Sequence, residues 1–487
     1  MLRLVPLLAA LLCAAPALAA PPPAAVSDAL RAPRPRGGEF LGLYLMDKKV
    51  GYLFSDLALV PGRPGEARSR TELVFKAQVG TKTSERRHRE DRVYESRPGG
   101  RLLSFVIIQE GDGGAQRLEG TAGRKALTVV RKRPGMPDET LSLAPSEERI
   151  EDADPARVAL LRRVTVQGHT TDAQDLGSYR VVTTVAAGKE AFVERTVGGV
   201  KVKLGRAVTL SDKEKVPVES YIASSGEMVE VAFGTTMRAR GEPESVAKRL
   251  DQVEVFGLTR IVLPRPLASQ ARAIPGAVSL VVEGLPEKFQ KNTARQTYRA
   301  LAGGRTEVKL TAATPSLAGR KSLPLGDPDG GENLRTSIII ESDNPRIQAI
   351  AHEVVGSERD AYLAAKKIVT WVATRLQKDY GASADRATDV LRQMKGDCTE
   401  HSLLTVSLLR ASGIPARRID GVVYLLNDDG VPALYWHEWV EAFVGEWTQM
   451  DPTFNQLVAD ATHFALGQEG NAEITPLIGQ LKVVEVR

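Results

Sequence analysis

Cysteine is scarce in this chain of 487 residues, which contains only Cys13 and Cys398. Two cysteines allow at most one internal disulfide bond, so a disulfide-stabilised scaffold is excluded. Aromatic residues make up only 5%, and no run of Lys and Arg is interleaved with them. The formal net charge of +5 is small for this length. The composition therefore does not favour a nucleic-acid-binding protein.

Long apolar runs are also missing after the first twenty residues, which argues against a later transmembrane helix. The first twenty combine a positive start at Arg3, an apolar stretch from Leu4 to Ala15 and an Ala17-Leu18-Ala19 pattern. This order is typical of a secretory signal peptide, residues 1–19, with cleavage after Ala19. The alternative, a membrane anchor, is disfavoured because the stretch is short and contains prolines. We expect a periplasmic or secreted protein without stable membrane insertion.

Cleavage after Ala19 removes Cys13 and leaves Cys398 as a single thiol. Exported proteins ordinarily pair their cysteines in disulfide bonds, and a lone cysteine has no partner within the chain. Cys398 is then either a small buried apolar residue or a reactive group, and its neighbours in the sequence must decide.

The chain is long enough for two to four domains. Residues 20–38, rich in Pro, Ala and Arg, predict a linker. Short apolar runs separated by Gly, Pro, Asp and Asn predict an antiparallel β-rich domain over 39–256, in one or two halves, with a short helix at 155–162. A small β domain is expected over 257–342. Helical periodicity begins near residue 343 and predicts a final α+β domain over 343–487.

Cys398 lies where two predicted helices meet. Lys395-Gly396-Asp397 ends one helix, and an apolar helix follows from Thr399 to Ala411, with Gly413 and Pro415 beyond it. Asp397 is expected to be the N-cap of this second helix. The unpaired N–H groups at a helix N-terminus favour a thiolate on Cys398 and can also bind an oxyanion.

A predicted β-hairpin follows, and it carries two polar residues suited to act with the thiol. His437 lies on an alternating strand with Trp439 and Glu441 on the same face. Asp451 follows the turn at Gly445, fourteen residues later, which suits adjacent strands. A carboxylate behind a histidine fixes its tautomer and stabilises its imidazolium form. Asp451 could alternatively begin the turn at Asp-Pro-Thr.

These segments resemble the transglutaminase-like superfamily in its exported bacterial branch. The resemblance rests on four blocks in order, spread over about residues 343–460: Gly396–Ser402, Arg410–Arg417, His437–Glu441, and Trp447 with Asp451–Phe454. It implies a papain-like α+β core with Cys398 as nucleophile, His437 as base and Asp451 as orienting acid. It also implies a protein or peptide substrate. No calcium-site pattern stands out, and no cofactor is implied.

Three functions are compatible with this resemblance. The first is a cysteine peptidase or amidase, in which water releases the enzyme from a thioester. The second is a transamidase that crosslinks protein glutamine residues to amines. The third is a binding scaffold that keeps the three residues without catalysis. The sequence does not distinguish water from an amine as acceptor, and it leaves the oligomeric state open.

A metal site is the remaining alternative for these residues. Cys398, Glu400 and His401 are close in the sequence, but no second pair of ligands has metal-binding spacing, so we expect no metal. His88, His169, His352 and His463 show no evident partner in the sequence.

Overall fold

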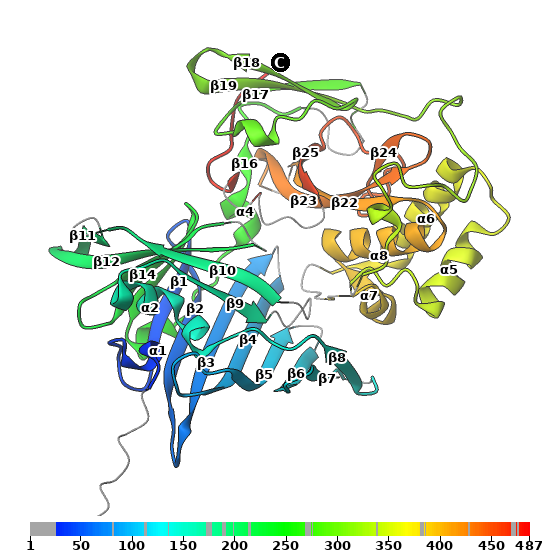
Figure 1. The fold of residues 1–487 in the computed structure, drawn as a ribbon. Helices are drawn as coiled ribbons and strands as arrows, with labels where there is room; N and C mark the ends of the chain where they lie inside the picture. The colour runs from blue at the N-terminus through cyan, green and yellow to red at the C-terminus, as the bar shows by residue number, and fades with distance from the viewer. Residues whose placement is uncertain are drawn as a thin grey trace, which may run out of the picture.

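The computed structural model describes residues 26–487 apart from 80–81, 112–113, 135, 172–177, 188–190, 198, 213–215, 268–273, 275, 338, 380–383, 385, 427–428, 469–473 and 475–476. The expected signal peptide, residues 1–19, lies outside the described residues. None of the helices in this described part combines the length and apolar character needed to cross a membrane. Figure 1 shows a large β-sheet built by the first half of the chain and a mixed lobe built by the second.

The first half of the chain forms a β-sheet of fifteen strands among the described residues. Its strands are β1 (Glu39–Leu45), β2 (Lys48–Val60), β3 (Arg63–Val79), β4 (Lys82–Glu95), β5 (Leu102–Gly111), β6 (Gly114–Ala122), β7 (Leu127–Lys132), β8 (Glu139–Leu143), β9 (Val166–Thr171), β10 (Ser178–Val185), β11 (Phe192–Val197), β12 (Val200–Ser211), β13 (Val218–Ile222), β14 (Met228–Phe233) and β15 (Met237–Glu242).

Most neighbouring strands in this sheet follow each other in the sequence. The order is β8-β7-β6-β5-β4-β3-β2-β1-β15-β14-β13-β12-β10-β9, and β11 pairs with β12 beside this path. Short turns suit antiparallel neighbours of this kind. The main exception is β1, which pairs with both β2 and β15 and so joins the start of the segment to its end. The predicted antiparallel β-rich region is therefore confirmed.

Short helices pack against this sheet. α2 (Pro155–Arg162) begins after the N-cap Asp154 and confirms the predicted short helix. α1 (Asp28–Arg31) lies inside the stretch predicted as a linker. Ala29 of α1 is nevertheless fully buried, in a core shared with Leu57 and Val158. The described part of that stretch thus packs on the sheet, because its few apolar residues have a core to enter.

Among its described residues, the second half of the chain contains three smaller sheets, one of only two strands, and a group of helices. Their elements are α3 (Glu244–Ala247), α4 (Val255–Thr259), β16 (Ile261–Val262), β17 (Ala277–Glu283), β18 (Gln296–Leu301), β19 (Arg305–Thr311), α5 (Pro345–Val355), α6 (Ala361–Arg375), β20 (Gln377–Lys378), α7 (Ala387–Gln393), β21 (Lys395–Gly396), α8 (Cys398–Ala411), β22 (Ala416–Leu426), β23 (Pro432–Phe443), β24 (Trp447–Met450), β25 (Phe464–Gln468) and β26 (Lys482–Val486).

The two larger of these sheets each contain strands from both sides of the boundary expected at residue 343. One has the order β18-β19-β17-β26, so the last strand of the chain joins strands from the 257–342 segment. The other has the order β16-β23-β22-β25, with β24 on β23, so β16 of that segment joins the later sheet. Leu280 and Phe464 lie in one hydrophobic core. These two segments therefore fold around a common core.

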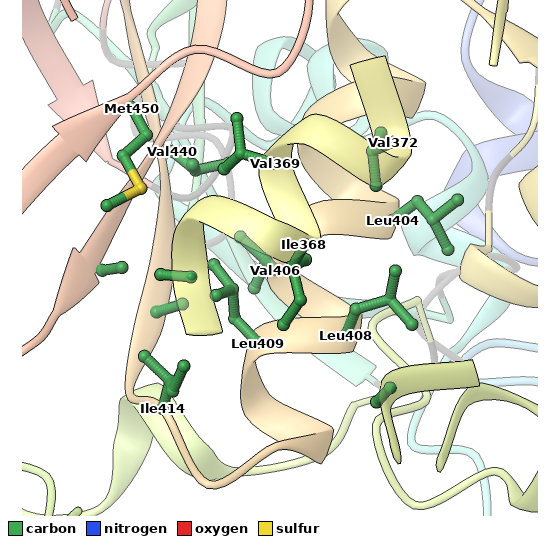
Figure 2. Close-up of a cluster of buried hydrophobic side chains, with 14 of the residues drawn as sticks. Ile368, Val369, Val372, Leu404, Val406, Leu408, Leu409, Ile414, Val440 and Met450 are labelled. Atoms are coloured by element: carbon green, nitrogen blue, oxygen red, sulfur yellow. The ribbon is translucent and has the colours of Figure 1, made fainter. Parts of the chain in front are cut away.

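Helix α8 is the centre of the helical group. Figure 2 shows its residues Leu404, Val406, Leu408 and Leu409 packed between α6 and the strands that carry Val440 and Met450. Leu404 and Val406 are fully buried, as is Val440 of β23. Residues that are apolar around most of a helix surface favour such a central position. The core thus fixes α8 against β23.

Segments that flank the large sheet contact this lobe. Trp436 Nε1 on β23 donates to the carbonyl of Thr259, at the end of α4, over 3.0 Å. Near the other end of the helical group, Arg133 reaches Asp389 of α7 at 3.4 Å. The N–H of Gln78 on β3 donates to the carbonyl of Val253 at 2.7 Å, so the segment around α4 links the large sheet to the strand that carries His437.

We expect Leu404→Ala to lower the free energy of unfolding of this lobe by about 2–5 kcal/mol, because it leaves a cavity in a closed core. Urea denaturation followed by circular dichroism measures the change. Leu363→Ala, on the exposed side of α6 where Leu363 is 38% exposed, is the matched control and should change the value by less than about 1 kcal/mol. Equal losses in the two variants would contradict the assignment of α8 to the core.

Candidate functional site

Cys398 is the first residue of α8, and Asp397 is the N-cap. Asp397 Oδ1 accepts the N–H of Thr399 at 2.8 Å, while Glu400 Oε2 accepts the N–H of Asp397 at 2.9 Å. This reciprocal pair is a capping box. A Cβ at Gly396 would lie 2.2 Å from Glu400 Cβ, so only glycine fits there. Cys398 is thereby held at the helix end, where backbone N–H groups have no partner within the helix.

His437 lies on β23, the strand against which α8 packs. One helical turn beyond Cys398, Ser402 Oγ donates to the carbonyl of Glu438 at 3.1 Å. The sulfur of Cys398 itself accepts a hydrogen bond from the backbone N–H of Glu438. The thiol therefore lies beside the residue that directly follows His437.

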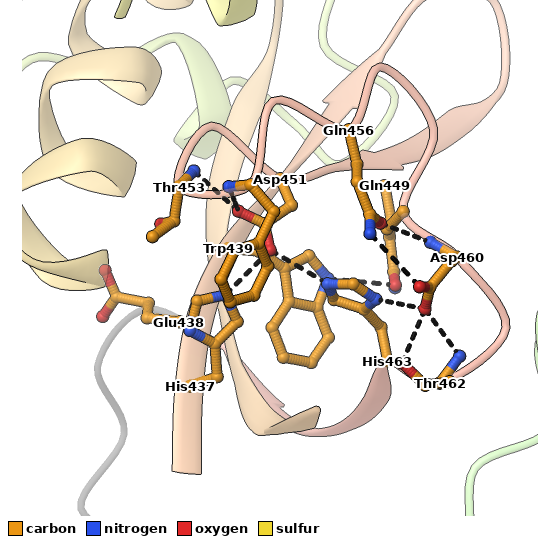
Figure 3. A network of polar contacts seen from close by, with 12 residues as sticks. His437, Glu438, Trp439, Gln449, Asp451, Thr453, Gln456, Asp460, Thr462 and His463 are labelled. Atoms are coloured by element: carbon orange, nitrogen blue, oxygen red, sulfur yellow. Dashed lines mark hydrogen bonds and ion pairs between the residues drawn. The ribbon is translucent and has the colours of Figure 1, made fainter. Parts of the chain in front are cut away.

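Asp451 directly follows β24, which pairs with β23 so that Met450 lies opposite Val440. His437 Nε2 and Asp451 Oδ2 are 2.8 Å apart, so the ring nitrogen donates to the carboxylate. The other oxygen, Oδ1, accepts the N–H groups of Thr453 at 2.7 Å and Phe454 at 3.1 Å. Asp451 thus both begins the Asp-Pro-Thr turn and holds the histidine (Figure 3).

The His437 ring is fixed from its faces as well as from its edge. Phe454 stacks on it with ring centroids 4.9 Å apart, and Trp439 with centroids 6.0 Å apart. Its side chain is only 6% exposed. Because Nε2 is occupied by Asp451, Nδ1 is the ring atom that can exchange a proton with a reacting group.

The electrostatics of Cys398 differ from the sequence expectation. Burial raises the pKa of the thiol well above its ordinary value, and the negative charges of Asp397 and Glu438 raise it further. The hydrogen bond from the Glu438 N–H acts in the opposite direction but does not outweigh these causes. The expectation that the helix N-terminus favours a thiolate is therefore wrong for this site as it stands. The main reason is the burial of the thiol, and the nearby carboxylates of Asp397 and Glu438 add to it.

Asp451 is ionised although it is completely buried. Burial alone would raise its pKa, but the charge and hydrogen bonds of His437 and His463 hold it well below the ordinary value. The carboxylate is saturated, because both oxygens accept two hydrogen bonds.

Two residues of this site, His463 and Asp460, were not predicted from the sequence. His463 Nε2 lies 3.0 Å from Asp451 Oδ2, and His463 Nδ1 lies 3.0 Å from Asp460 Oδ1. Figure 3 shows His463 between the two carboxylates. Two other histidines for which the sequence showed no partner also contact carboxylates: His88 contacts Glu90 at 2.7 Å, and His169 contacts Glu147 at 3.0 Å. No local pattern signals the pairing of His463 with Asp451, because the turn around Asp460 creates it.

Glu400 and His401, which were considered with Cys398 as metal ligands, use their side-chain atoms in hydrogen bonds to the backbone. Glu400 accepts backbone N–H groups of Ala384 and Asp397 at 3.0 and 2.9 Å, and His401 Nδ1 donates to the Asp397 carbonyl at 2.7 Å.

A second group, made of His437, Asp451 and His463, has ligand atoms within 4.8 Å of one another. Asp451 Oδ2 already lies 2.8 Å and 3.0 Å from the two ring nitrogens. These separations are those of N–H···O hydrogen bonds, so we assign a hydrogen-bond network to this group.

Comparison with known proteins identifies a family for part of the chain. Residues 348–452 match the model of the transglutaminase-like superfamily. An uncharacterised protein of Mycobacterium leprae (strain TN) is 27% identical over 144 residues, which are 28% of this chain and 50% of that protein. The chain thus matches only half the length of that curated relative.

Solved structures give weaker likenesses. A candidate cysteine protease from Cytophaga hutchinsonii aligns with 44% of this chain and 85% of its own, at 18% identity and a TM-score of 0.30. The periplasmic domain of TgpA from Pseudomonas aeruginosa, bound to ethylmercury, aligns with 40% of this chain and 89% of its own, at 16% identity and a TM-score of 0.25. Cys398, His437 and Asp451 all lie inside the matched segment. Residues 348–452 of this chain are a transglutaminase-like superfamily domain.

Proposed function

We propose that this protein is an exported cysteine enzyme that hydrolyses amide bonds of proteins or peptides through a thioester. The observation that supports it most is the juxtaposition at α8 and β23. The thiol of Cys398 lies beside the Glu438 N–H, and the adjacent His437 has its Nε2 2.8 Å from a buried carboxylate. In this proposal Cys398 is the nucleophile, His437 the general base and Asp451 the orienting acid.

The chemistry follows from the ring nitrogen that remains available. Cys398 Sγ attacks the carbonyl carbon of the amide while its proton passes to His437 Nδ1. The backbone N–H groups at the start of α8 stabilise the negative oxygen of the tetrahedral intermediate. His437 then gives the proton to the leaving nitrogen, and the C–N bond breaks to leave a thioester. Water, deprotonated by His437, attacks the thioester and releases the acid and the free thiol.

Asp451 acts through His437. Its ionised carboxylate keeps the Nε2–H edge of the ring turned inward and stabilises the imidazolium that forms during each proton transfer. Because the pKa of Cys398 is raised by burial and by two carboxylates, the thiol is neutral at rest. Proton transfer is then part of the reaction step.

The raised pKa of Cys398 also favours a second candidate, a binding scaffold whose thiol does not react. An inert thiol is the property that separates this scaffold from an enzyme. A transamidase would form the same thioester but pass it to an amine. Export to the periplasm or outside the cell is part of the proposal and rests on the expected signal peptide.

We expect Cys398→Ala and His437→Gln to reduce peptide hydrolysis by about 10³-fold or more, because each removes a group that takes part in bond breaking. Release of new amino termini from a mixed peptide library, followed by mass spectrometry, measures the rate. His352→Gln, on the exposed surface of α5, is the control and should keep the wild-type rate.

Hydroxylamine should intercept the thioester as a hydroxamate. Transfer of the acyl group to a fluorescent amine in place of hydrolysis would instead support the transamidase.

Glu438→Gln should move the alkylation of Cys398 by iodoacetamide to lower pH. The substitution removes a negative charge beside the sulfur, which stabilises the thiolate and lowers the pKa of Cys398, by about one pH unit. The pH dependence of the alkylation rate in the mature protein measures this, since Cys398 is then the only thiol. Glu446→Gln, at the exposed turn of the same hairpin, is the matched control. An alkylation profile that does not move in Glu438→Gln, or that moves equally in Glu446→Gln, would contradict the charge effect assigned to Glu438.

A further inference from the structure

His463 occupies an unusual position, because both of its ring nitrogens face carboxylate oxygens. Nε2 lies 3.0 Å from Asp451 Oδ2 and Nδ1 lies 3.0 Å from Asp460 Oδ1, and the side chain is completely buried. A neutral imidazole has one N–H and one lone pair. It would therefore direct a lone pair at a carboxylate, whereas the protonated ring donates both hydrogen bonds.

Asp460 is itself held as a carboxylate. Its Oδ1 accepts the N–H and the hydroxyl of Thr462, at 2.8 and 2.6 Å, in addition to His463. Its Oδ2 accepts the N–H of Ile274 and the amide of Gln456, both at 3.2 Å. Five donors on one carboxylate favour the ionised form strongly. Asp460 therefore cannot supply the proton that a neutral His463 would need at Nδ1.

Two other polar groups face this cluster from neighbouring elements. His437 on β23 has its ring centroid 6.1 Å from that of His463. Arg295, which precedes β18, donates to the carbonyls of Ala459 and Asp460 at 2.8 Å each. Burial opposes a charge on His463, but the hydrogen bonds and charges of Asp451 and Asp460 outweigh it, and the pKa of His463 is raised above its ordinary value.

The balance of charge explains what His463 can do to its neighbour. Asp451 and Asp460 bring two negative charges into a closed site, and His463 in its protonated form cancels one of them. His437 and His463 share Asp451 Oδ2. The positive charge on His463 therefore weakens the electrostatic stabilisation that Asp451 gives to a protonated His437. Without a cation on His463, the full charge of Asp451 would act on His437 and favour its imidazolium form.

We propose that His463 is a permanently protonated positioning residue that shares Asp451 with His437 and lowers the pH at which His437 takes up a proton. The inference deepens the proposed function, since it assigns the tuning of the proposed base. Asp460 and His463 lie beyond residues 348–452, the part of the chain that matches the family model. Their loop is held by Arg295 and by Gln296, whose side chain accepts the N–H of Ala465 at 3.1 Å. The proposed site therefore includes support from the β17–β19 segment.

The protonation state of His463 can be measured without any substrate. In full-length mature protein labelled with ¹⁵N-histidine, we expect His463 to show two N–H protons and imidazolium nitrogen shifts throughout pH 6–8. The chain has six histidines, and single His→Gln variants assign the signals. A neutral His463 at pH 7 would overturn the proposal.

The effect on His437 is tested by His463→Gln, which keeps a donor toward Asp451 and removes the charge. The midpoint of His437 protonation should rise by about one pH unit, and His352→Gln should leave it unchanged. An unchanged or lowered midpoint would overturn the proposal. If His463→Gln does not fold, Asp460→Asn replaces it, and its expected result is that His463 begins to titrate between pH 5 and 8. A His463 that stays protonated in Asp460→Asn would overturn the proposal.

Activity separates this inference from the proposed function. The acid limb of kcat/KM for peptide hydrolysis should move with the His437 midpoint in His463→Gln. A midpoint that shifts as expected in a protein without any hydrolytic activity would support the inference and overturn the proposed function. Hydrolysis with an acid limb that does not move would support the function and overturn the inference.

Discussion

The buried carboxylate of Asp451 is the interaction on which the arrangement of the site depends. It receives donors from β23, from its own turn and from the loop before β25. A buried carboxylate without donors would destabilise the fold, because moving a charged group out of water costs free energy that only hydrogen bonds and an opposite charge can offset. Each donor that satisfies Asp451 also fixes a piece of backbone. The same contacts that keep the charge buried therefore orient the ring of His437.

The supporting shell extends well outside the transglutaminase-like domain. Arg295 is buried and uses its guanidinium to hold two carbonyls of the loop that carries Asp460. The pKa of Arg295 is lowered to about 10 by burial, against the opposing charges of Glu441 and Asp460. It remains charged at neutral pH. Arg295 and Gln296, at the start of β18, therefore hold the loop that carries His463. The small sheet that contains β18 and β26 thus supports the site.

The environment of Cys398 keeps its thiol in the protonated form when no substrate is bound. Burial and the charges of Asp397 and Glu438 keep the thiol protonated. Glu400, close by at the start of α8, has its pKa raised to about 8 by burial and by Asp397, which favours its neutral form. In the proposed mechanism a thiol that stays neutral until a carbonyl is in place is protected from adventitious alkylation and oxidation, which require the thiolate.

The local features of this protein could be predicted from the sequence. The signature around Cys398, the cap at Asp397 and the apolar stretch to Ala411 predict a buried helix, and the structure has α8 at Cys398–Ala411. The pairing of His437 with Asp451 could also be predicted, because a hairpin brings residues fourteen apart onto neighbouring strands. These features depend on short-range periodicity, capping and turn chemistry, which the order of residues encodes directly.

Only the tertiary structure decided the features that depend on distant segments. His463 and Asp460 reach Asp451 through a turn that Arg295 holds, from more than 160 residues earlier in the chain. The shift in the pKa of Cys398 depends on Glu438, which the packing of α8 on β23 places beside the sulfur. β26 returns to pair with β17 across the expected domain boundary. Charge and burial at a site are sums over neighbours in space, so the sequence determined which residues could react, and the fold determined their protonation.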